Sequence, residues 1–388
     1  AADLTANVGT EVSVVGDSVK VEVVHGTTLS TDDVTVDAAG LTTVHGAELL
    51  DVSAESVKLE AAQDGSLRMG GDATVSVGDS LEVSATTSLG VSTGGKVSSL
   101  SNEMELDIDS ALKASAGTLS MDVAGDAVLS VGDDLVAMAH DVTLKGDGDF
   151  KASFAGAGDV DVQQLEMSVG TELKVNAGTA AELTTAALRV VSSDSVDVST
   201  DALTLEATET TTLFSGSSLT TSTKTMGGHS FEDTTLTAGK RLTTTSSDAT
   251  LNVGSTIDVS AHDTRIRNDG VVDVFAKESA RVTTANMALS VGEEVQIMGG
   301  NKVVMTTPSL ELNADTKADL SAKEMMASVS TSLTATVGTT TQLTAEDVSV
   351  DAGNDMVVSG VSGSQVSMST DHASVSTAAD LTANVGTE

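Results

Sequence analysis

Pairs of apolar residues that enclose one other residue recur about every eight positions along this chain. From Leu310 onward, nine steps between successive pairs cover 71 residues, a mean of about 7.9 residues. A regular spacing of this kind predicts a repeated structural unit. The later pairs begin near positions 310, 318, 325, 333, 341, 348, 356, 366, 373 and 381, and the earlier ones at Leu41, Leu50, Val57, Leu67, Val75, Leu81, Leu89, Val97, Met104 and Leu112.

Each unit is predicted to be a short β-strand followed by a turn. Val75 and Val77 lie two residues apart, so they face the same side of a strand. Gly78 and Asp79 follow, and both residue types favour a reversal of the chain before Leu81 begins the next strand. A helix is disfavoured because residues two apart do not share a helical face. Disorder is disfavoured because the spacing is kept throughout the chain. The predicted fold class is therefore all-β.

A strand–turn unit of about eight residues cannot bury its own apolar face, so the units must stack into an elongated β-helix or β-solenoid. Two arrangements achieve this. One chain can coil with three units per turn, or three chains can wind around a common axis, each giving one unit to every layer. A single-chain coil predicts a pattern with a period of about 24 residues. No such pattern is visible, so the sequence favours the intertwined homotrimer.

The two ends of the chain carry the same sequence. Ala1 to Glu11 recur without change as Ala378 to Glu388, an offset of 377 residues. We interpret residues 1–377 as one period of a tandem repeat and residues 378–388 as the start of the next copy, with residues 1–388 forming one continuous β-helical rod. With strands about 4.7 Å apart, one period would advance roughly 220 Å in the trimer and about a third of that in the solenoid.

Large side chains are scarce in this chain of 388 residues. Apolar residues make up 39%, but aromatic residues only 1%, with neither Tyr nor Trp. A narrow core with room for two aliphatic side chains per unit accounts for this composition. The few aromatic side chains are then expected at local swellings of the core or in outward patches: Phe150, Phe154, Phe214, Phe231 and Phe275.

The charge of the chain excludes two classes of partner. It has 57 acidic and 19 basic side chains, for a formal net charge of −38. Such a surface repels nucleic acid and anionic lipid, and no apolar run is long enough to span a membrane. We interpret the charge as a means of keeping long rods soluble and apart. Cysteine is absent, which excludes disulfides and thiolate metal sites.

Units of the form Val-Gly-Asp/Glu-x-Leu/Val-x-Val resemble the triple-stranded β-helix of phage tail spikes and of valine-glycine-repeat (VgrG-type) secretion spikes. The segments Val77–Val83 and Val131–Leu135 carry the likeness best, which spans most of the chain in its repeat spacing. The resemblance implies an intertwined needle. The chain departs from that family in two ways: it shows no lysozyme-like, baseplate-like or tip-like segment, and an unchanged return after 377 residues is not expected of a needle.

Residues that could carry chemistry are scattered. The acidic turn Gly146–Asp149 matches the calcium-binding turns of β-rolls only in part, which leaves Ca²⁺ a weakly supported ligand. No nucleophile elbow and no aromatic sugar platform is found, so no catalytic and no cofactor-binding residue is predicted. Histidines form no H-x-x-x-H or H-x-H pair, so no metal-binding residue is predicted either. They are His25, His45, His140, His229, His262 and His372.

Two short segments interrupt the spacing, Gly227–His229 and Arg265–Gly270. We interpret them as tolerated loops on a regular scaffold, with bulges, kinks or contact points between rods as the alternatives.

Together these observations predict a structural protein and not an enzyme. It would form the stiff acidic shaft of an extracellular filament or cell-surface appendage, including one that is stored and then discharged. Its partners would be further copies of the chain, in a homotrimer and in end-to-end or lateral filament assembly. Two other functions stay open: an envelope-puncturing spike, which requires a pointed tip and an attachment domain, and an adhesin stalk, which requires a terminal binding module.

Overall fold

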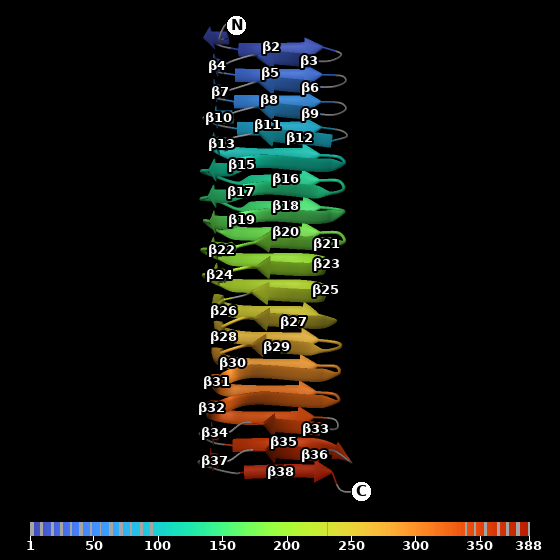
Figure 1. The fold of residues 1–388 in the computed structure, drawn as a ribbon, viewed down its shortest axis with the longest axis vertical. Coiled ribbons are helices and arrows are strands. Elements are labelled where there is room, and N and C mark those ends of the chain that lie inside the picture. Colours follow the sequence, from blue (N-terminus) through green and yellow to red (C-terminus); the bar gives the residue numbers. More distant parts are fainter. Residues whose placement is uncertain are drawn as a thin grey trace. The chain divides into compact units, whose positions relative to one another are not determined.

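A computed structural model of the chain consists of parallel β-strands (Figure 1). It describes residues 96–230 and 232–337 without a gap and, on either side of these ranges, the strands and few of the residues between them. The described residues contain no helix, which confirms the all-β prediction, and therefore none that could cross a membrane. The chain forms two units, Ala1–Asp194 and Ser195–Glu388.

The strands of the first unit are β1 (Leu4–Asn7), β2 (Glu11–Gly16), β3 (Val19–Val23), β4 (Gly26–Ser30), β5 (Asp33–Ala38), β6 (Thr42–Gly46), β7 (Leu49–Ala54), β8 (Ser56–Ala61), β9 (Gly65–Met69), β10 (Ala73–Val77), β11 (Ser80–Ala85), β12 (Ser88–Thr93), β13 (Lys96–Ser101), β14 (Glu103–Ile108), β15 (Ala111–Val123), β16 (Ala127–Val131), β17 (Leu135–Gly146), β18 (Phe150–Phe154), β19 (Ala157–Val169), β20 (Glu172–Ala177), β21 (Ala180–Thr185) and β22 (Ala187–Ser192). Those of the second unit are β23 (Ser195–Ala207), β24 (Thr211–Ser215), β25 (Ser218–Ser230), β26 (Thr234–Ser246), β27 (Asp248–Val253), β28 (Thr256–Asn268), β29 (Val272–Ala276), β30 (Ser279–Val291), β31 (Glu294–Ala314), β32 (Lys317–Val337), β33 (Thr340–Thr344), β34 (Asp347–Ala352), β35 (Asp355–Ser362), β36 (Gln365–Ser369), β37 (His372–Thr377) and β38 (Leu381–Gly386).

Within each unit the chain pairs with itself in successive coils. In the first unit, Leu112 of β15 pairs with Leu135 of β17, and Leu135 pairs with Gly158 of β19. In the second unit, Val272 of β29 pairs in the same way with Val295 of β31. One coil takes 23 residues, which is also the sequence separation of many hydrogen bonds between neighbouring coils. The structure thus shows a single-chain β-solenoid, in which one chain supplies all sides of a coil. The intertwined homotrimer that the sequence favours is not shown.

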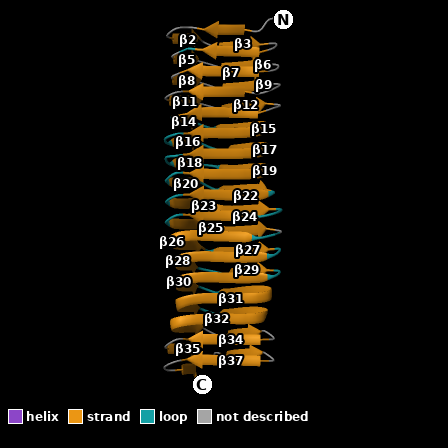
Figure 2. Ribbon diagram, turned by 90° about the vertical axis from the view of Figure 1, so that its left-hand side faces the viewer, coloured by secondary structure: helices purple, strands orange, loops and turns teal. Residues whose placement is uncertain are grey.

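Three strand segments make up one coil, and Figure 2 shows such segments stacked in parallel. In the coil that begins at Leu112, the segments start at Leu112, Leu119 and Ala127, before Leu135 begins the next coil. In each segment the first, third and fifth side chains face inward, because alternate residues of a strand point to opposite sides. The predicted spacing is confirmed: Leu112 and Met104 are buried first positions, as are Leu310, Met325 and Leu333 in the second unit.

The core of the coils is thin and aliphatic, as the composition predicts. In the first unit a column of buried first-position side chains runs from coil to coil through Val34, Val57, Leu81, Met104 and Ala127. Fully burying one Val, Leu or Met side chain contributes about 1.5–3 kcal/mol. Because a coil cannot complete this column alone, its stability comes from its neighbours.

Two of the described aromatic residues face outward, as predicted, and two pack in the core. Phe154 is buried, and Gly158 leaves room for it, since a Cβ there would clash with the Phe154 ring. Phe150 is partly buried and packs against the aliphatic core. Phe214 and Phe275 face outward and are 41% and 38% exposed. Phe231 lies outside the described residues.

The two predicted interruptions are regular parts of the coil. Gly227 and His229 continue β25 and pair in register with Thr204 and Glu206 of β23. Arg265 lies within β28, which runs to Asn268 before an ordinary turn. The interpretation of both segments as loops is therefore wrong, and β28 departs from its register with β26 elsewhere, between Ala238 and Arg241.

Both copies of the recurring terminal sequence form a strand, β1 and β38. Whether residues 1–377 are one period of a tandem array, and residues 1–388 one continuous rod, stays a prediction.

Candidate functional site: the polar corners of the coils

The corners between the three sides of a coil are of two lengths. From Leu112 to Leu119 the next side starts after seven residues, and β15 passes through this corner without interruption. From Leu119 to Ala127, and from Ala127 to Leu135, the step is eight residues and a turn separates the strands. We call these seven-residue and eight-residue corners. The mean spacing of the apolar pairs, slightly under eight, therefore combines two distinct geometries.

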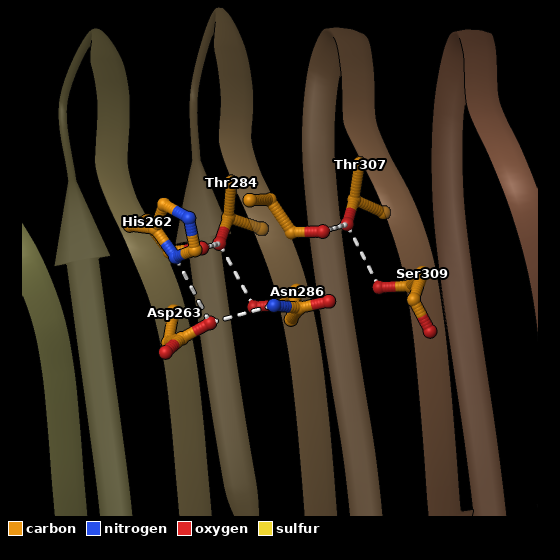
Figure 3. Close-up of polar contacts among 7 residues, drawn as sticks. His262, Asp263, Thr284, Asn286, Thr307 and Ser309 are labelled. Carbon is orange, nitrogen blue, oxygen red and sulfur yellow. Dashed lines mark hydrogen bonds and ion pairs between the residues drawn. The ribbon is translucent and has the colours of Figure 1, made fainter.

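Several seven-residue corners carry a buried threonine that bonds to two backbone carbonyls, whereas the corner from Leu112 to Leu119 has Ala116 at this place. The Thr284 hydroxyl lies 2.8 Å from the carbonyl oxygen of Asn286 and 3.0 Å from that of His262 in the neighbouring coil. Thr307 repeats the arrangement one coil later, 2.8 Å from Ser309 and 3.4 Å from Ala285 (Figure 3). The single hydroxyl thereby serves acceptors that the tight corner withdraws from water. Further threonines at such corners make the bond to the residue two positions on: Thr185, Thr200 and Thr223.

Several eight-residue corners carry serine at the same place, where others, such as the corner from Leu119 to Ala127, carry valine (Val123). Ser192 donates to the carbonyl oxygen of Thr171, and Ser230 donates to that of Glu209, each in the neighbouring coil. Ser215 instead donates to the carbonyl oxygen of Ser218, three residues on.

Glycine begins several eight-residue corners. A Cβ on Gly132 would clash with the carbonyl oxygen of Asp109, one coil away, and one on Gly170 would clash with that of Asp147. This close approach of two backbones explains the repeated Val-Gly pairs, in which the valine ends a side and the glycine opens the turn. The predicted turn at Gly78–Asp79 lies outside the described residues.

Aspartates at the turns bond to the backbone of the next coil. Asp126 Oδ1 accepts from the amide of Asp149 at 2.9 Å, and Asp134 Oδ1 accepts from the amide of Ala157 at 2.9 Å. In the second unit Asp248 Oδ1 accepts from the amide of Val271 at 3.1 Å. Each bond spans 23 residues, which is one coil. These carboxylates therefore satisfy amides that a turn leaves outside the strand ladder.

In the acidic turn Gly146–Asp149, the carboxylate of Asp149 is already hydrogen-bonded to other groups of the protein. The Asp149 carboxylate accepts from Lys151 Nζ at 2.8 Å, from the Thr171 hydroxyl and from the Glu172 amide. The hydrogen bond from Lys151, followed by that from Thr171, lowers the pKa of Asp149. Within the part of the chain that the structure describes, no three His, Asp or Glu side chains are grouped to hold a metal ion. Ca²⁺ binding stays a prediction without further support.

The histidines lie apart, as the sequence indicates. His140 and His262 are exposed and each contacts the aspartate that follows it, at 2.9 Å from Asp141 and 3.2 Å from Asp263. A hydrogen bond from Asn286 at 2.7 Å is the main reason that the pKa of Asp263 is lowered, and the bond from His262 adds to it. His229 lies within β25. His25 lies outside the described residues, and the side chains of His45 and His372 are not described.

Basic side chains reach acidic ones across one coil. Lys224 lies 2.8 Å from Asp201, and Lys317 lies 2.8 Å from Glu294, each pair 23 residues apart in sequence. The hydrogen bond that Lys317 donates to Glu294 raises the pKa of Lys317. Exposed pairs of this kind contribute roughly 0–1 kcal/mol each. They align neighbouring coils more than they stabilise them.

Many of the polar groups at the described corners thus bond to the same or the neighbouring coil. An apolar void near Val91, Ala114 and Ala137 is lined by aliphatic side chains apart from Ser115. No protein-family model, no curated protein sequence and no solved structure matches the chain. The likeness to phage-tail and secretion spikes therefore stays a resemblance in repeat spacing, while the fold itself is a parallel β-solenoid.

Proposed function

We propose that this chain is a structural protein that forms the stiff, acidic shaft of an extracellular filament or appendage. The observation that carries the proposal is where the polar side chains are used. At many of the described corners, threonine or serine hydroxyls and aspartate carboxylates bond to the backbone of the same or the neighbouring coil. Groups used in this way hold coils together and are not free to bind a substrate.

The ladder supports a mechanical role. Within each unit, neighbouring coils are joined by backbone hydrogen bonds on three sides and by an aliphatic core. Bending such a stack requires the bonds on one side to lengthen while those on the other are compressed. Because neighbouring coils are also joined by the corner bonds, resistance to bending is distributed over the whole perimeter.

The charge supports exposure to solvent along a long surface. A net charge of −38 on 388 residues keeps parallel shafts apart unless a specific contact joins them. Closing the strands into coils also leaves no open sheet edge along the sides, where unplanned strand pairing would start.

Electron microscopy and fibre diffraction test this proposal. At about 4.7 Å per coil of 23 residues, the whole chain as one solenoid would be roughly 80 Å long. We expect rods of at least this length and, from aligned samples, a reflection near 4.7–4.8 Å along the rod axis. Round particles of about 55 Å, the diameter of a globule of this size, would refute the proposal.

A further inference from the structure

Two arginines on one side of the second unit have no acidic partner. Arg265 and Arg267 lie two residues apart in β28, both are exposed, and neither forms an ion pair among the described residues. Asp263, at the adjacent corner, is affected by the charge of Arg265 but bonds to Asn286 and His262 instead. We call Arg265 and Arg267 the arginine surface.

The arginine surface has short side chains on both sides. The Cα partners of its residues are Thr243 and Thr245 in β26 and Ala288 and Ser290 in β30. All four side chains are uncharged. The two guanidinium groups therefore extend from a flat part of the coil, where another flat surface can approach both at once.

Two aspartates with the same spacing lie on one side of the first unit. Asp159 and Asp161 are two residues apart in β19, both are exposed, and neither pairs with a cation among the described residues. The Cα partner of Asp159 in β21 is Glu182, which is also exposed and adds negative charge. The Cα partner of Asp161 in β17 is Met138, which is 53% exposed. We call Asp159 and Asp161 the aspartate surface.

We propose that the arginine surface of one copy of this chain binds the aspartate surface of a second copy. Residues two apart on a strand are about 6.6–6.8 Å apart, so the spacing of the two guanidinium groups matches that of the two carboxylates. Exposed methionine beside the aspartates gives the arginine stems an apolar surface to cover. The proposal rests on the proposed shaft function, since it specifies how shafts associate laterally.

The contact joins two different surfaces, so each copy keeps one of each kind free for the next. A head-to-tail contact of this kind extends into an open assembly unless its geometry closes a ring. It also explains how a strongly acidic protein associates at all. Against a general repulsion, a local match of opposite charge and equal spacing favours one alignment of two copies.

Sedimentation velocity of the full chain in low and high salt tests the proposal. At about 150 mM salt the Debye length is roughly 8 Å, which screens the general repulsion between two acidic chains but not a direct contact, and at 1 M it is about 3 Å. We expect assemblies at about 150 mM salt that dissociate to single chains at 1 M. A protein that sediments as a single chain at every salt concentration, or whose assemblies persist at 1 M salt, would overturn the proposal. Rod shape, measured at high salt, tests the shaft function separately.

Charge reversal identifies the surfaces. The double variant R265E/R267E and the double variant D159R/D161R should each associate at least about tenfold more weakly than the wild type, because attraction becomes repulsion. An equimolar mixture of the two variants should associate again, since glutamates of one then face arginines of the other. Failure of the mixture to associate would overturn the pairing.

A matched control separates the contact from net charge. Lys113 and Lys174 are exposed and have no ion-pair partner among the described residues. The double variant K113E/K174E changes the net charge by the same amount as R265E/R267E, and it should associate like the wild type. Equal loss of association in the control would show a general charge effect and refute the proposal. Circular dichroism confirms the fold of each variant first.

Discussion

Thr284 offers the sharpest test of how the corners stabilise the coil. Its side chain is only 5% exposed, and its hydroxyl lies within hydrogen-bond distance of two carbonyl oxygens, those of Asn286 and His262. The substitution Thr284→Val keeps the branched shape and removes only the hydroxyl. It therefore isolates the hydrogen bond from packing. Both carbonyl oxygens then lose a buried donor.

The expected loss of stability depends on how many hydrogen bonds the Thr284 hydroxyl can donate at one time. One hydroxyl has one proton, so only one of the two bonds is fully formed at a time. A net hydrogen bond contributes about 1 kcal/mol, and a buried acceptor left without a donor costs about 1–3 kcal/mol. Because a carbonyl keeps a second lone pair that the strand ladder can use, we expect the lower part of that range. Thr284→Val should reduce the free energy of unfolding by about 1–2 kcal/mol.

Thr264 supplies a control for which the expected change in the free energy of unfolding has the opposite sign. Its side chain is 1% exposed, and its hydroxyl has no hydrogen-bond partner among the described residues. Thr264→Val removes a buried unsatisfied group, so it should raise the free energy of unfolding by about 1 kcal/mol. The same chemical change should thus stabilise at one position and destabilise at another in the same unit.

Urea unfolding followed by far-ultraviolet circular dichroism measures both variants, because the chain has no Trp or Tyr for fluorescence. Solenoids need not unfold in a single step, so midpoints should be compared only where the slope of the transition is unchanged. A Thr284→Val variant as stable as the wild type would refute the corner mechanism. So would equal destabilisation by Thr264→Val, which would show that the methyl group, and not the hydroxyl, decides.

Three further predictions follow from the coil length and from the shifted carboxyl groups. Deleting residues 135–157, which form one whole coil, should preserve the fold. Deleting residues 150–157, which form one side of a coil, should abolish the cooperative unfolding transition in circular dichroism. An intertwined trimer would instead tolerate the shorter deletion. Because the pKa of Asp149 is lowered, the stability from its hydrogen bonds should be present above about pH 4 and be lost as the pH falls through the lowered pKa. The variant Asp149→Asn should therefore be less stable than the wild type at about pH 6, by up to about 1 kcal/mol, and as stable as the wild type at about pH 2. Burial, and then the charge of Glu294, raise the pKa of Asp273, so Asp273→Asn should unfold at higher urea than the wild type at pH 7, with a gain that disappears as the pH falls through the raised pKa.

Much of the fold could be predicted from apolar spacing alone. Leu81, Leu89, Val97, Met104 and Leu112, predicted as strand starts, all start a side of a coil. The spacing predicts the inward positions because the alternation of buried and exposed residues is a local property of a strand, which tertiary contacts do not change. Val-Gly pairs likewise predict turns, since the valine ends a side and the glycine opens a corner.

The number of chains could not be predicted because the short step moves from corner to corner. In the first unit the seven-residue step runs from Leu112 to Leu119. In the second unit it runs from Leu219 to Met226, and later from Ala280 to Met287 within β30. A single-chain coil imprints a fixed period on the sequence only if the short step stays at one corner. Its movement hides the period.

The threonine corners were missed although the sequence contains a signal for them. Where a seven-residue corner carries threonine, the threonine precedes the next apolar position by three residues, as in Thr284 to Met287 and Thr307 to Leu310. Where an eight-residue corner carries serine, the serine precedes it by four residues, as in Ser192 to Val196. The difference between a distance of three residues and one of four cannot be recognised in the sequence until the inward positions are known. The pairing of charged groups one coil apart could not be foreseen for the same reason.

The two kinds of corner differ in what foreign sequence they could accept. At Asp133 and Asp134 a turn separates two strands and both residues are exposed, so a peptide inserted there would extend into solvent and would disturb only the bonds of that turn, such as the one from the Ala157 amide to Asp134. At Thr284 or Thr307 the strand continues through the corner, and an insertion would separate the hydroxyl from its acceptors. Eight-residue corners are therefore natural positions for displaying epitopes at intervals that are multiples of one coil height, about 4.7 Å.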